Sequence, residues 1–590
     1  MSQSAFVHPL LSAHASRYSP HVERVTERVF LAVGFGLANT VMIVGDGGIV
    51  VVDTLESIEA AAEARDALRE HCDLPVRALV YTHGHPDHVW GARAWVPEGT
   101  PIGGPNGVEI ICHESVPHYV NEFANVLAPR YTLGGIYMYG ALLPDGPEGF
   151  VVNGIGPRLR AGSRGYLPPT HTFATEDDIE LAGIRMKLVF APGESPDQIF
   201  VWLPDDRVVL SGDTVYRSFP NIYTIRGARF RDPRDWYHSV DKIRAFKPEH
   251  LVPCHGSAIS GASEVSEVLC AYRDAIQYVF DQTIRGMNAG LAPSDLATSI
   301  SLPPSLSSHP YLEQLYGQVD LCVQEIYTGL YGWFSGDGSE LCAMSTQEEA
   351  AEIVALAGGL DGARTALNRS IEEGKVAWAT KLATRILRTH PEATDVARIK
   401  ADLLRRLAHE TPNANIRNWW LTEAAVLDGT VSLTPEIGSA VARSRAAGLL
   451  EGVPVHDTVA ALAVRLDPKA SEGVHRSFML TVFEKLQPHS SDSGTPATSP
   501  KDTDERKDLQ GHKVSAVTVP IVVRNCVCAI EPWDLAVPDF AVQLSKATLI
   551  DLVLGELTWR AALNSGAAIL TRGDSDAFLD FVALFDGWDS

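Results

Sequence analysis

The first 260 residues alternate short apolar runs with amphipathic or polar segments. Two β-branched runs within 28–53 are separated by the sequence GDGG, which predicts a β-hairpin. Residues 55–71 have the spacing of an amphipathic helix, and 76–82 form another apolar run that predicts a buried strand. A strand, a helix and a strand in this order predict a layered α/β fold.

Four further short apolar runs follow, and each ends at a polar turn. They cover 184–193, 197–204, 207–214 and 250–256, and their turns contain glutamate, aspartate or histidine. Functional sites of open α/β sheets lie where strands end. These turns are therefore candidates for one shared site.

The pattern becomes helical from about residue 265. Apolar residues in 371–390 and 393–410 recur at i, i+3 and i+4, which predicts two antiparallel helices joined at Pro391 and Glu392. Helices and strands mix again from residue 435. Residues 487–511 are rich in serine, proline, aspartate and threonine, so we predict a disordered insertion there.

Length and composition indicate a multidomain globular protein. The chain has 590 residues, of which 45% are hydrophobic and 21% charged. A chain of this length exceeds one hydrophobic core, so two to four domains are expected. The changes of pattern place them at 1–265, 266–430 and 431–590.

The charge and cysteine content exclude several classes of protein. A formal net charge of -24 argues against a nucleic-acid-binding protein, because no basic excess neutralises phosphates. The eight cysteines form no C-x-x-C pair, which is typical of a reduced, cytoplasmic chain. The first thirty residues do not have the pattern of a signal peptide, and no apolar stretch of 18 residues predicts a membrane span.

The turn that follows residues 76–82 holds four potential metal ligands within six positions: His83, His85, Asp87 and His88. Imidazoles and a carboxylate suit Zn²⁺ or a similar divalent ion. An H-x-H pair alone is more typical of a histidine-rich surface turn. The full H-x-H-x-D-H pattern after a buried strand favours a metal site, and one such turn can begin two sites about 3.5–4 Å apart.

Two metal sites need ligands from other turns, and Glu194, Asp213 and His255 each follow a short apolar run. Singly, such a glutamate is usually a turn residue and such an aspartate a helix cap. Their shared position at strand ends favours ligands instead. The predicted assignment divides seven residues between two ions, with Asp213 as the bridge: His83, His85 and Glu194 on one ion, and Asp87, His88 and His255 on the other. A metal-bound water or hydroxide would then be the nucleophile.

The H-x-H-x-D-H turn, the strand that ends at Asp53, and the later Asp213 and His255 resemble the metallo-β-lactamase fold superfamily. The superfamily usually has a histidine where this chain has Glu194. A glutamate there resembles the alkylsulfatase branch, whose members are dinuclear zinc enzymes that hydrolyse alkyl sulfate esters.

The order of later segments extends this resemblance over nearly the whole chain. They are similar, in turn, to the family's pocket-lining insertion, anion-binding segment, dimerisation domain and sterol-carrier-type domain: 137–156, 221–232, 330–337 with 371–409, and 534–574. The resemblance implies an α/β fold with an αββα sandwich in 1–265, an all-α dimerisation domain in 266–430 and an α+β sterol-carrier-like domain in 431–590. It also implies a homodimer with two Zn²⁺ per chain.

The chain departs from the family pattern at three places. Asp213 stands where the family has a second glutamate, residues 214–221 contain no histidine, and Cys254 and His255 stand in place of a His-His-Trp-Pro motif. An aspartate bridge is usual in the superfamily, so a dinuclear site is still expected. The group that protonates the leaving alcohol, and the identity of the ester, stay open.

Four residues are candidates for substrate contacts. The guanidinium of Arg226 matches a sulfate bidentately and is the predicted anion clamp; the alternative is a surface arginine. Tyr137 and Tyr139 either donate hydrogen bonds to a substrate oxygen or pack in the core, and Arg217 could replace the missing histidines as a cation. Asp87 and Arg226 are the predicted catalytic residues.

Three functions are compatible with these features. The first is a dinuclear zinc hydrolase that cleaves a small, hydrophobic, anionic ester, namely an alkyl sulfate, to alcohol and sulfate. The second keeps the metals but cleaves a thioester or lactone, because the family's histidines are missing. The third is a non-catalytic lipid-binding dimer, which only the C-terminal domain favours.

Overall fold

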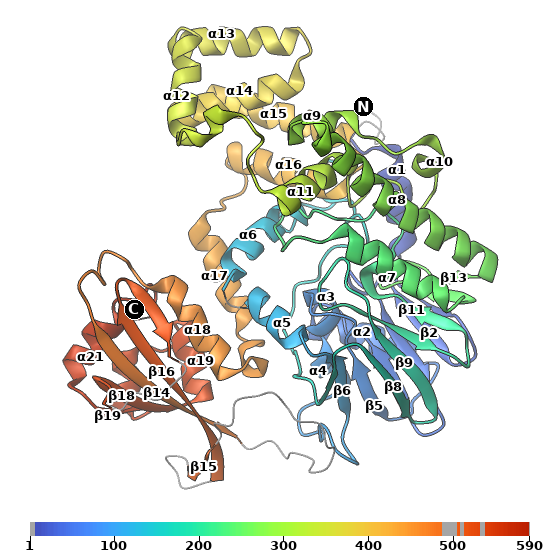
Figure 1. The fold of residues 1–590 in the computed structure, drawn as a ribbon, viewed down its shortest axis with the longest axis vertical. Coiled ribbons are helices and arrows are strands. Elements are labelled where there is room, and N and C mark those ends of the chain that lie inside the picture. Colours follow the sequence, from blue (N-terminus) through green and yellow to red (C-terminus); the bar gives the residue numbers. More distant parts are fainter. Residues whose placement is uncertain (1–5, 125, 486–503, 508–512, 532–536, 589–590) are drawn as a thin grey trace.

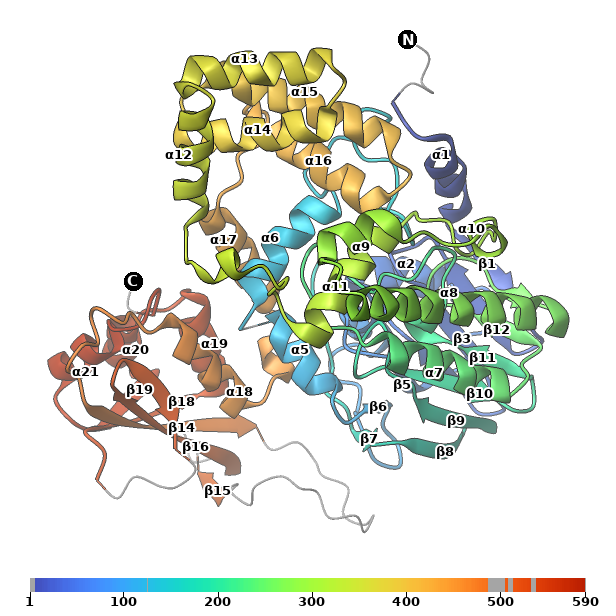
Figure 2. The same ribbon diagram turned by 45° about the horizontal axis from the view of Figure 1, so that its top comes forward.

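The computed structural model describes residues 6–124, 126–485, 504–507, 513–531 and 537–588. Within them the chain forms an N-terminal α/β part, a helical part and a smaller C-terminal part with its own sheet. Figure 1 shows the first part at the lower right in blue and green and the third at the lower left in orange and red. In Figures 1 and 2, the helices from α12 (Thr346–Leu356) to α15 (Thr394–Glu410) project away from both.

The first sheet of the N-terminal part contains β1 to β7 in chain order. Its strands are β1 (His21–Arg24), β2 (Val29–Val33), β3 (Thr40–Val44), β4 (Ile49–Val52), β5 (Val76–Val80), β6 (Glu109–His113) and β7 (His171–Phe173). β1 to β4 pair antiparallel, and β3 and β4 form the predicted hairpin. β4 to β7 pair parallel, so β4 and β5 both end at the edge where the polar turns lie.

The second sheet has the order β13-β12-β11-β10-β9-β8. Its strands are β8 (Glu176–Leu181), β9 (Ile184–Phe190), β10 (Ile199–Leu203), β11 (Val208–Leu210), β12 (His250–Val252) and β13 (Ile259–Ser260). β9, β10, β11 and β12 coincide with the four predicted apolar runs. The parallel pairing of β11 with β12 brings the turns after them to the same edge.

The two sheets stack face to face, and helices cover their outer faces. Alternate residues of both sheets, such as Val50 and Val80 from one and Leu188 and Val201 from the other, form the core between them. The other faces pack against α2 (Ile58–Arg69) and α4 (Ala92–Trp95) on the first sheet, and against α7 (Pro233–Ala245) and α8 (Ala262–Asn288) on the second. This confirms the predicted αββα sandwich.

The helical part is built on long amphipathic helices. α11 (Val319–Tyr331) packs on α8, while α12, α13 (Gly359–Glu372), α14 (Val376–Thr389) and α15 share a separate apolar core. The predicted helix pair corresponds to α14 and α15, although α14 begins at Val376 because residues 371–372 complete α13. α16 (Ala414–Leu427) then leads to α17 (Pro435–Ala446), which lies against α6 (Ala128–Met138).

The C-terminal part is an α+β domain, as predicted. Its sheet has the order β15-β16-β14-β18-β19, with β17 (Val527–Ile530) paired to β16. The strands are β14 (Arg476–Lys485), β15 (Asp504–Lys507), β16 (Lys513–Arg524), β18 (Phe540–Ser545) and β19 (Ala568–Arg572). Most of the predicted insertion at 487–511 lies outside the described residues, but β15 lies within it.

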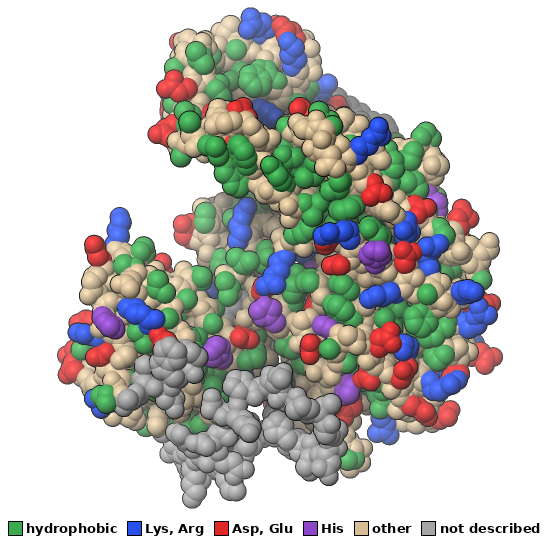
Figure 3. All heavy atoms as spheres, in the orientation of Figure 1, with side chains coloured by type: hydrophobic (Ala, Val, Ile, Leu, Met, Phe, Trp, Pro, Cys, Tyr) green, Lys and Arg blue, Asp and Glu red, His purple; other side chains and the backbone are tan. Residues whose placement is uncertain are grey.

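All eight cysteines are free thiols. No helix in the described part of the chain is long and apolar enough to cross a membrane. Acidic and basic side chains are interspersed on the face shown in Figure 3.

The turn after β5 is packed tightly against the loop after β4 at Gly91. A Cβ atom at Gly91 would lie 1.9 Å from the carbonyl oxygen of Thr54 and 2.6 Å from the Cβ of Ala61, so a methyl group does not fit there. Gly91→Ala is therefore expected to lower the free energy of unfolding by about 3 kcal/mol, since the backbone must shift. Urea unfolding measures this. Gly47→Ala, at a glycine with no atom within 4 Å, is the control and should change little.

Candidate metal centre

The H-x-H-x-D-H turn lies directly after β5, where the chain leaves the first sheet. His83 and His85 are in the loop, and Asp87 and His88 are in the short helix α3 (Pro86–Val89). All four side chains are buried. Pro86 at the first turn of α3 supports this tight start, because its fixed φ suits the first helical positions.

The other three predicted ligands reach the same place from the second sheet. Glu194 follows β9, Asp213 follows β11 and His255 follows β12, and all three are buried. One ligand atom of each residue lies within 4.8 Å of the others in four overlapping groups: Asp53, His88 and Cys254; His83, His88 and Asp213; Asp87, His88 and His255; and His85, Glu194 and Asp213. The structure thus brings all seven predicted residues together.

Asp213 lies between the two predicted ligand sets. Its Oδ2 is 3.6 Å from His83 Nε2, while its Oδ1 is 3.1 Å from His255 Nε2 and 3.6 Å from His88 Nε2. Each oxygen therefore faces a different set, which is the arrangement that a bridging carboxylate needs. Asp87 completes the second set, with its Oδ2 3.6 Å from His88 Nε2 and 3.7 Å from His255 Nε2.

The donor atoms of this cluster fit divalent metal ions. Four buried ligand atoms make no hydrogen bond to a described residue: His88 Nε2, His255 Nε2, Glu194 Oε2 and Asp213 Oδ1. The first two meet Asp213 Oδ1 only as ion-pair partners, at 3.6 and 3.1 Å. Unpaired buried polar atoms cost free energy, and a bound cation would remove that cost. Imidazole nitrogens and carboxylate oxygens are the ligands that Zn²⁺ takes in proteins.

Burial and charge set the protonation of the cluster. Burial lowers the pKa of His83 and of His85 well below the usual value, so both imidazoles are neutral and can accept a metal. Burial alone would raise the pKa of Asp213, but His255, His88 and His83 outweigh it and hold that pKa well below its usual value. The bridging position therefore holds a carboxylate anion.

Asp53 orients the second ligand set without joining it. Its Oδ2 accepts hydrogen bonds from His88 Nδ1 at 2.7 Å, Thr82 Oγ1 at 2.7 Å and Cys254 Sγ at 3.0 Å, and its Oδ1 accepts one from Thr82 N at 2.8 Å. With Nδ1 engaged, His88 presents Nε2 to Asp87 and Asp213. The group of Asp53, His88 and Cys254 is thus a hydrogen-bonded support rather than an open ligand set.

Arg231 is a site residue that the sequence did not reveal. It is 4% exposed, and its Nη1 lies 2.8 Å from Glu194 Oε1 and donates to the carbonyl of Asn221 at 2.6 Å. Glu194 Oε1 is therefore occupied, and Oε2 stays free to face the cluster. The sequence R-G-A-R-F-R at 226–231 offered three arginines, and only the fold decides that Arg231 turns inward to Glu194.

A cavity of about 610 Å³ opens directly from the cluster. Its wall includes His85, Asp87, Glu194 and Asp213, together with apolar and aromatic residues such as Leu37, Trp90, Phe123 and Ile155. α17 and the segment 158–164 close its other side. A polar end beside an apolar wall suits a ligand with an anionic head and an apolar body.

Two of the four predicted substrate residues line this cavity, and two do not. Arg226 and Tyr139 both do, and the Arg226 guanidinium lies 5.3 Å from the Phe123 ring centre. Tyr137 packs against Trp419 at 4.9 Å between ring centres, and Arg217 lies over the Tyr311 ring at 4.9 Å. Neither is among the lining residues, so the prediction that they contact substrate gains no support from their positions.

Two family models match the chain. Residues 33–255 match the metallo-beta-lactamase superfamily, and residues 292–429 match the alkyl sulfatase dimerisation domain. The first match covers the sandwich from β3 to β12 with the whole ligand cluster, and the second covers the helices from α9 (Pro293–Ser299) to α16.

The chain is also similar to characterised proteins over most of its length. It is 36% identical over 440 residues to a linear primary-alkylsulfatase of Pseudomonas sp. (strain ATCC 19151), which covers 73% of this chain and 83% of that protein. It is 25% identical over 575 residues to an (R)-specific secondary-alkylsulfatase of Pseudomonas sp., covering 96% and 80%. The solved structure of the inverting sec-alkylsulfatase Pisa1 from Pseudomonas sp. superposes with a TM-score of 0.86 at 22% identity, covering 99% of this chain and 87% of that one.

Arg231→Met is expected to destabilise the metal-free protein. The substitution leaves Glu194 buried without its cation, and breaking such a pair costs about 3 kcal/mol. Urea unfolding of metal-free protein measures the loss, and the double variant Arg231→Met, Glu194→Met should recover part of it. Arg185→Met removes a solvent-exposed partner of Asp205 and is the control, with little change expected. Equal effects of Arg231→Met and Arg185→Met would contradict the assignment.

Proposed function

The chain belongs to the alkylsulfatase family of the metallo-beta-lactamase superfamily, and on that premise we propose that it hydrolyses alkyl sulfate esters to an alcohol and sulfate. The proposed site is the ligand cluster, with two Zn²⁺ per chain. The observation that carries the proposal is the convergence of seven buried ligand side chains at one end of a cavity that His85, Asp87, Glu194, Asp213 and Arg226 line.

The proposed roles divide between ligands and substrate contacts. One ion would be held by His83, His85 and Glu194. The other ion would be held by Asp87, His88 and His255. Asp213 would contact both ions. Ions bound there would polarise the ester and acidify a water molecule to serve as nucleophile. Asp53 and Arg231 keep His88 and Glu194 in the required orientations.

The chain's own side chains would bind the sulfate and exclude water from the alkyl group. The Arg226 guanidinium offers a planar pair of donors that matches two sulfate oxygens. Tyr139 is half-buried and lines the cavity together with Arg226, where it supplies a hydroxyl donor; burial raises the pKa of this hydroxyl, so it keeps its proton. Leu37, Trp90 and Ile155 would surround the apolar body of the substrate.

We also propose that the protein works as a homodimer. Residues 292–429 match the alkyl sulfatase dimerisation domain. Large apolar side chains in the same region are exposed to solvent: Tyr331, Trp333, Leu341, Met344 and Leu356. Exposed apolar side chains gathered within one segment of the chain are typical of a protein interface.

A substrate panel tests the proposed activity. Protein loaded with two equivalents of zinc should release sulfate from dodecyl sulfate or from secondary alkyl sulfates, as measured by ion chromatography. Acyl thioesters and lactones belong in the same panel, because Asp213 and the absence of histidine in 214–221 also allow an acyl hydrolase. Turnover of thioesters or lactones alone would replace the sulfate proposal with that alternative.

His85→Ala tests the site itself. We expect the variant to lose turnover by more than about a thousandfold, because a ligand is removed from the centre that activates the nucleophile. Metal analysis should show less than the wild-type zinc content, while circular dichroism and the dimer mass stay unchanged. His456→Ala removes an exposed histidine and is the matched control. Activity of His85→Ala within about tenfold of wild type would place the active site elsewhere.

A further inference from the structure

The cavity that opens from the ligand cluster has five arginines in its wall: Arg158, Arg160, Arg164, Arg226 and Arg445. The alkyl group of a substrate needs no cation around it, and the protein as a whole carries a formal net charge of -24, so this gathering of arginines needs another explanation. Arginines that line a cavity without carboxylate partners are therefore candidates for ligand contacts.

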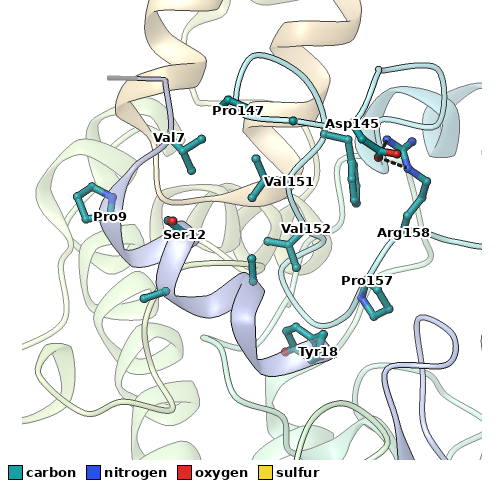
Figure 4. A pocket seen from close by; sticks show the side chains of 14 residues that line it. Val7, Pro9, Ser12, Tyr18, Asp145, Pro147, Val151, Val152, Pro157 and Arg158 are labelled. Carbon is teal, nitrogen blue, oxygen red and sulfur yellow. Dashed lines mark hydrogen bonds and ion pairs between the residues drawn. The ribbon is translucent and has the colours of Figure 1, made fainter. Parts of the chain in front are cut away.

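Two of these arginines are engaged by the protein. Arg158 donates to Asp145 Oδ1 at 2.9 Å and to the carbonyl of Leu143 at 2.9 Å, and Figure 4 shows it turned toward Asp145. Arg160 donates to both carboxylate oxygens of Glu63, at 2.5 and 2.7 Å. These contacts satisfy both guanidinium groups within the protein.

Arg164 and Arg445 are not engaged in this way. Arg164 lies 4.9 Å over the Trp90 ring, and Nη1 donates to the carbonyl of Gly162, but its buried Nε has no partner among the described residues. Arg445 makes no hydrogen bond or ion pair with any described residue, although it is only partly exposed and lines the cavity. Both guanidinium groups thus keep donors for a ligand.

The fold brings the end of α17 against the segment that carries Arg164, and both arginines line the cavity there. Gly448, just after α17, packs directly on the backbone of Arg164. A Cβ atom at Gly448 would lie 2.3 Å from the carbonyl oxygen of Arg164. Burial, and after it the positive charge of Arg445, lower the pKa of Arg164 to about 10. Two adjacent cations repel each other, and an anion between them would relieve that cost.

The carboxylates nearest to Arg164 have other partners. Glu56 accepts hydrogen bonds from the backbone N–H groups of Leu37 and Arg160, and Glu59 accepts them from Ser163 N and Oγ. Neither forms an ion pair with Arg164 or Arg445 among the described residues.

The pair is also separate from the cations at the ligand cluster. Arg231 is paired with the ligand Glu194, its Nη1 2.8 Å from Oε1, and it is not among the residues that line the cavity. Arg226 packs on Phe123 of α5 (Val116–Ala124), and Arg164 packs on Trp90. The cavity therefore has a cationic group at each of two places, with apolar residues such as Leu159 and Val441 in its wall.

We propose that Arg164 and Arg445 form a second anion subsite, so that the preferred substrates are sulfate esters with another anionic group at the far end of an apolar body. The substrate part of this inference rests on the proposed function. The second group is a carboxylate or a second sulfate, because a guanidinium binds either one bidentately.

Binding of inert anions tests the subsite without turnover. Isothermal titration of the zinc-loaded protein compares α,ω-alkanedisulfonates with alkanemonosulfonates of equal length, from six to twelve carbons. We expect the disulfonate to bind about tenfold tighter at the length that spans both subsites, as for a charge-assisted hydrogen-bonded pair. Arg164→Gln and Arg445→Gln should each abolish that difference, and Arg445→Lys should retain part of it.

Arg443→Gln is the matched control. Arg443 lies in the same last turn of α17, where it also interacts favourably with the helix dipole, but it is exposed and is not among the lining residues. This variant should keep the wild-type preference for disulfonates. Equal binding of mono- and disulfonates by the wild type at every length, or the same loss in Arg443→Gln as in Arg445→Gln, overturns the proposal.

Kinetics then assign the class of substrate. The ratio of KM for an alkyl sulfate to KM for the ω-carboxyalkyl sulfate of equal length should exceed one in the wild type, and should fall about tenfold in Arg445→Gln. If the wild type hydrolyses no sulfate ester, the proposed function fails, while the titration still decides on the subsite. If it hydrolyses both esters with equal KM at every length, the second anionic group is not part of the substrate.

Discussion

The carboxylate of Asp53 joins the two halves of the candidate site. It lies at the end of β4 in the first sheet and accepts hydrogen bonds from the turn after β5 and from Cys254, which follows β12 in the second sheet. Asp53 itself has a φ of 58°, a left-handed conformation that is unfavourable for a residue with a Cβ. The network of hydrogen bonds outweighs this cost, because a buried charge needs every partner it can obtain.

The sandwich brings the strand ends that carry this network to one edge. Parallel neighbours β4 and β5 in one sheet, and β11 and β12 in the other, end at the same edge. Polar turns from both sheets meet there above a core of valine, leucine and isoleucine. The apolar layer fixes the strands, and the strands hold side chains of fixed orientation around a space for divalent ions. Arg231 adds to this by occupying one oxygen of Glu194 and leaving the other free.

The later parts of the chain shape what can reach that centre. α17 connects the helical part to the C-terminal domain, and it packs on α6 and closes the cavity with Val441, Ser444 and Arg445. The residues that follow α17 pack on the segment 164–166. The joint between the helical part and the C-terminal domain thus forms part of the cavity wall.

Much of this site was predictable from the sequence, and the reason is local. The H-x-H-x-D-H turn brings four ligands together within six residues, and the period of the apolar runs shows that Glu194, Asp213 and His255 follow strands. Rules of strand order then bring such turns to one edge. Local patterns also predicted a layered α/β fold and the helix pair α14–α15, while the αββα arrangement followed from the resemblance to the superfamily.

Only the tertiary structure decided the direction in which long side chains of ambiguous role point. Tyr137 and Arg217 were plausible substrate contacts, yet they pack on Trp419 and Tyr311, which are far away in sequence. Arg231, Arg164 and Arg445 had no distinguishing motif, yet the fold turns the first toward Glu194 and the other two into the cavity. The sequence by itself determined the metal turn, because its ligands are neighbours along the chain. The surroundings of the substrate depend on contacts between residues up to several hundred positions apart, and no local pattern encodes them.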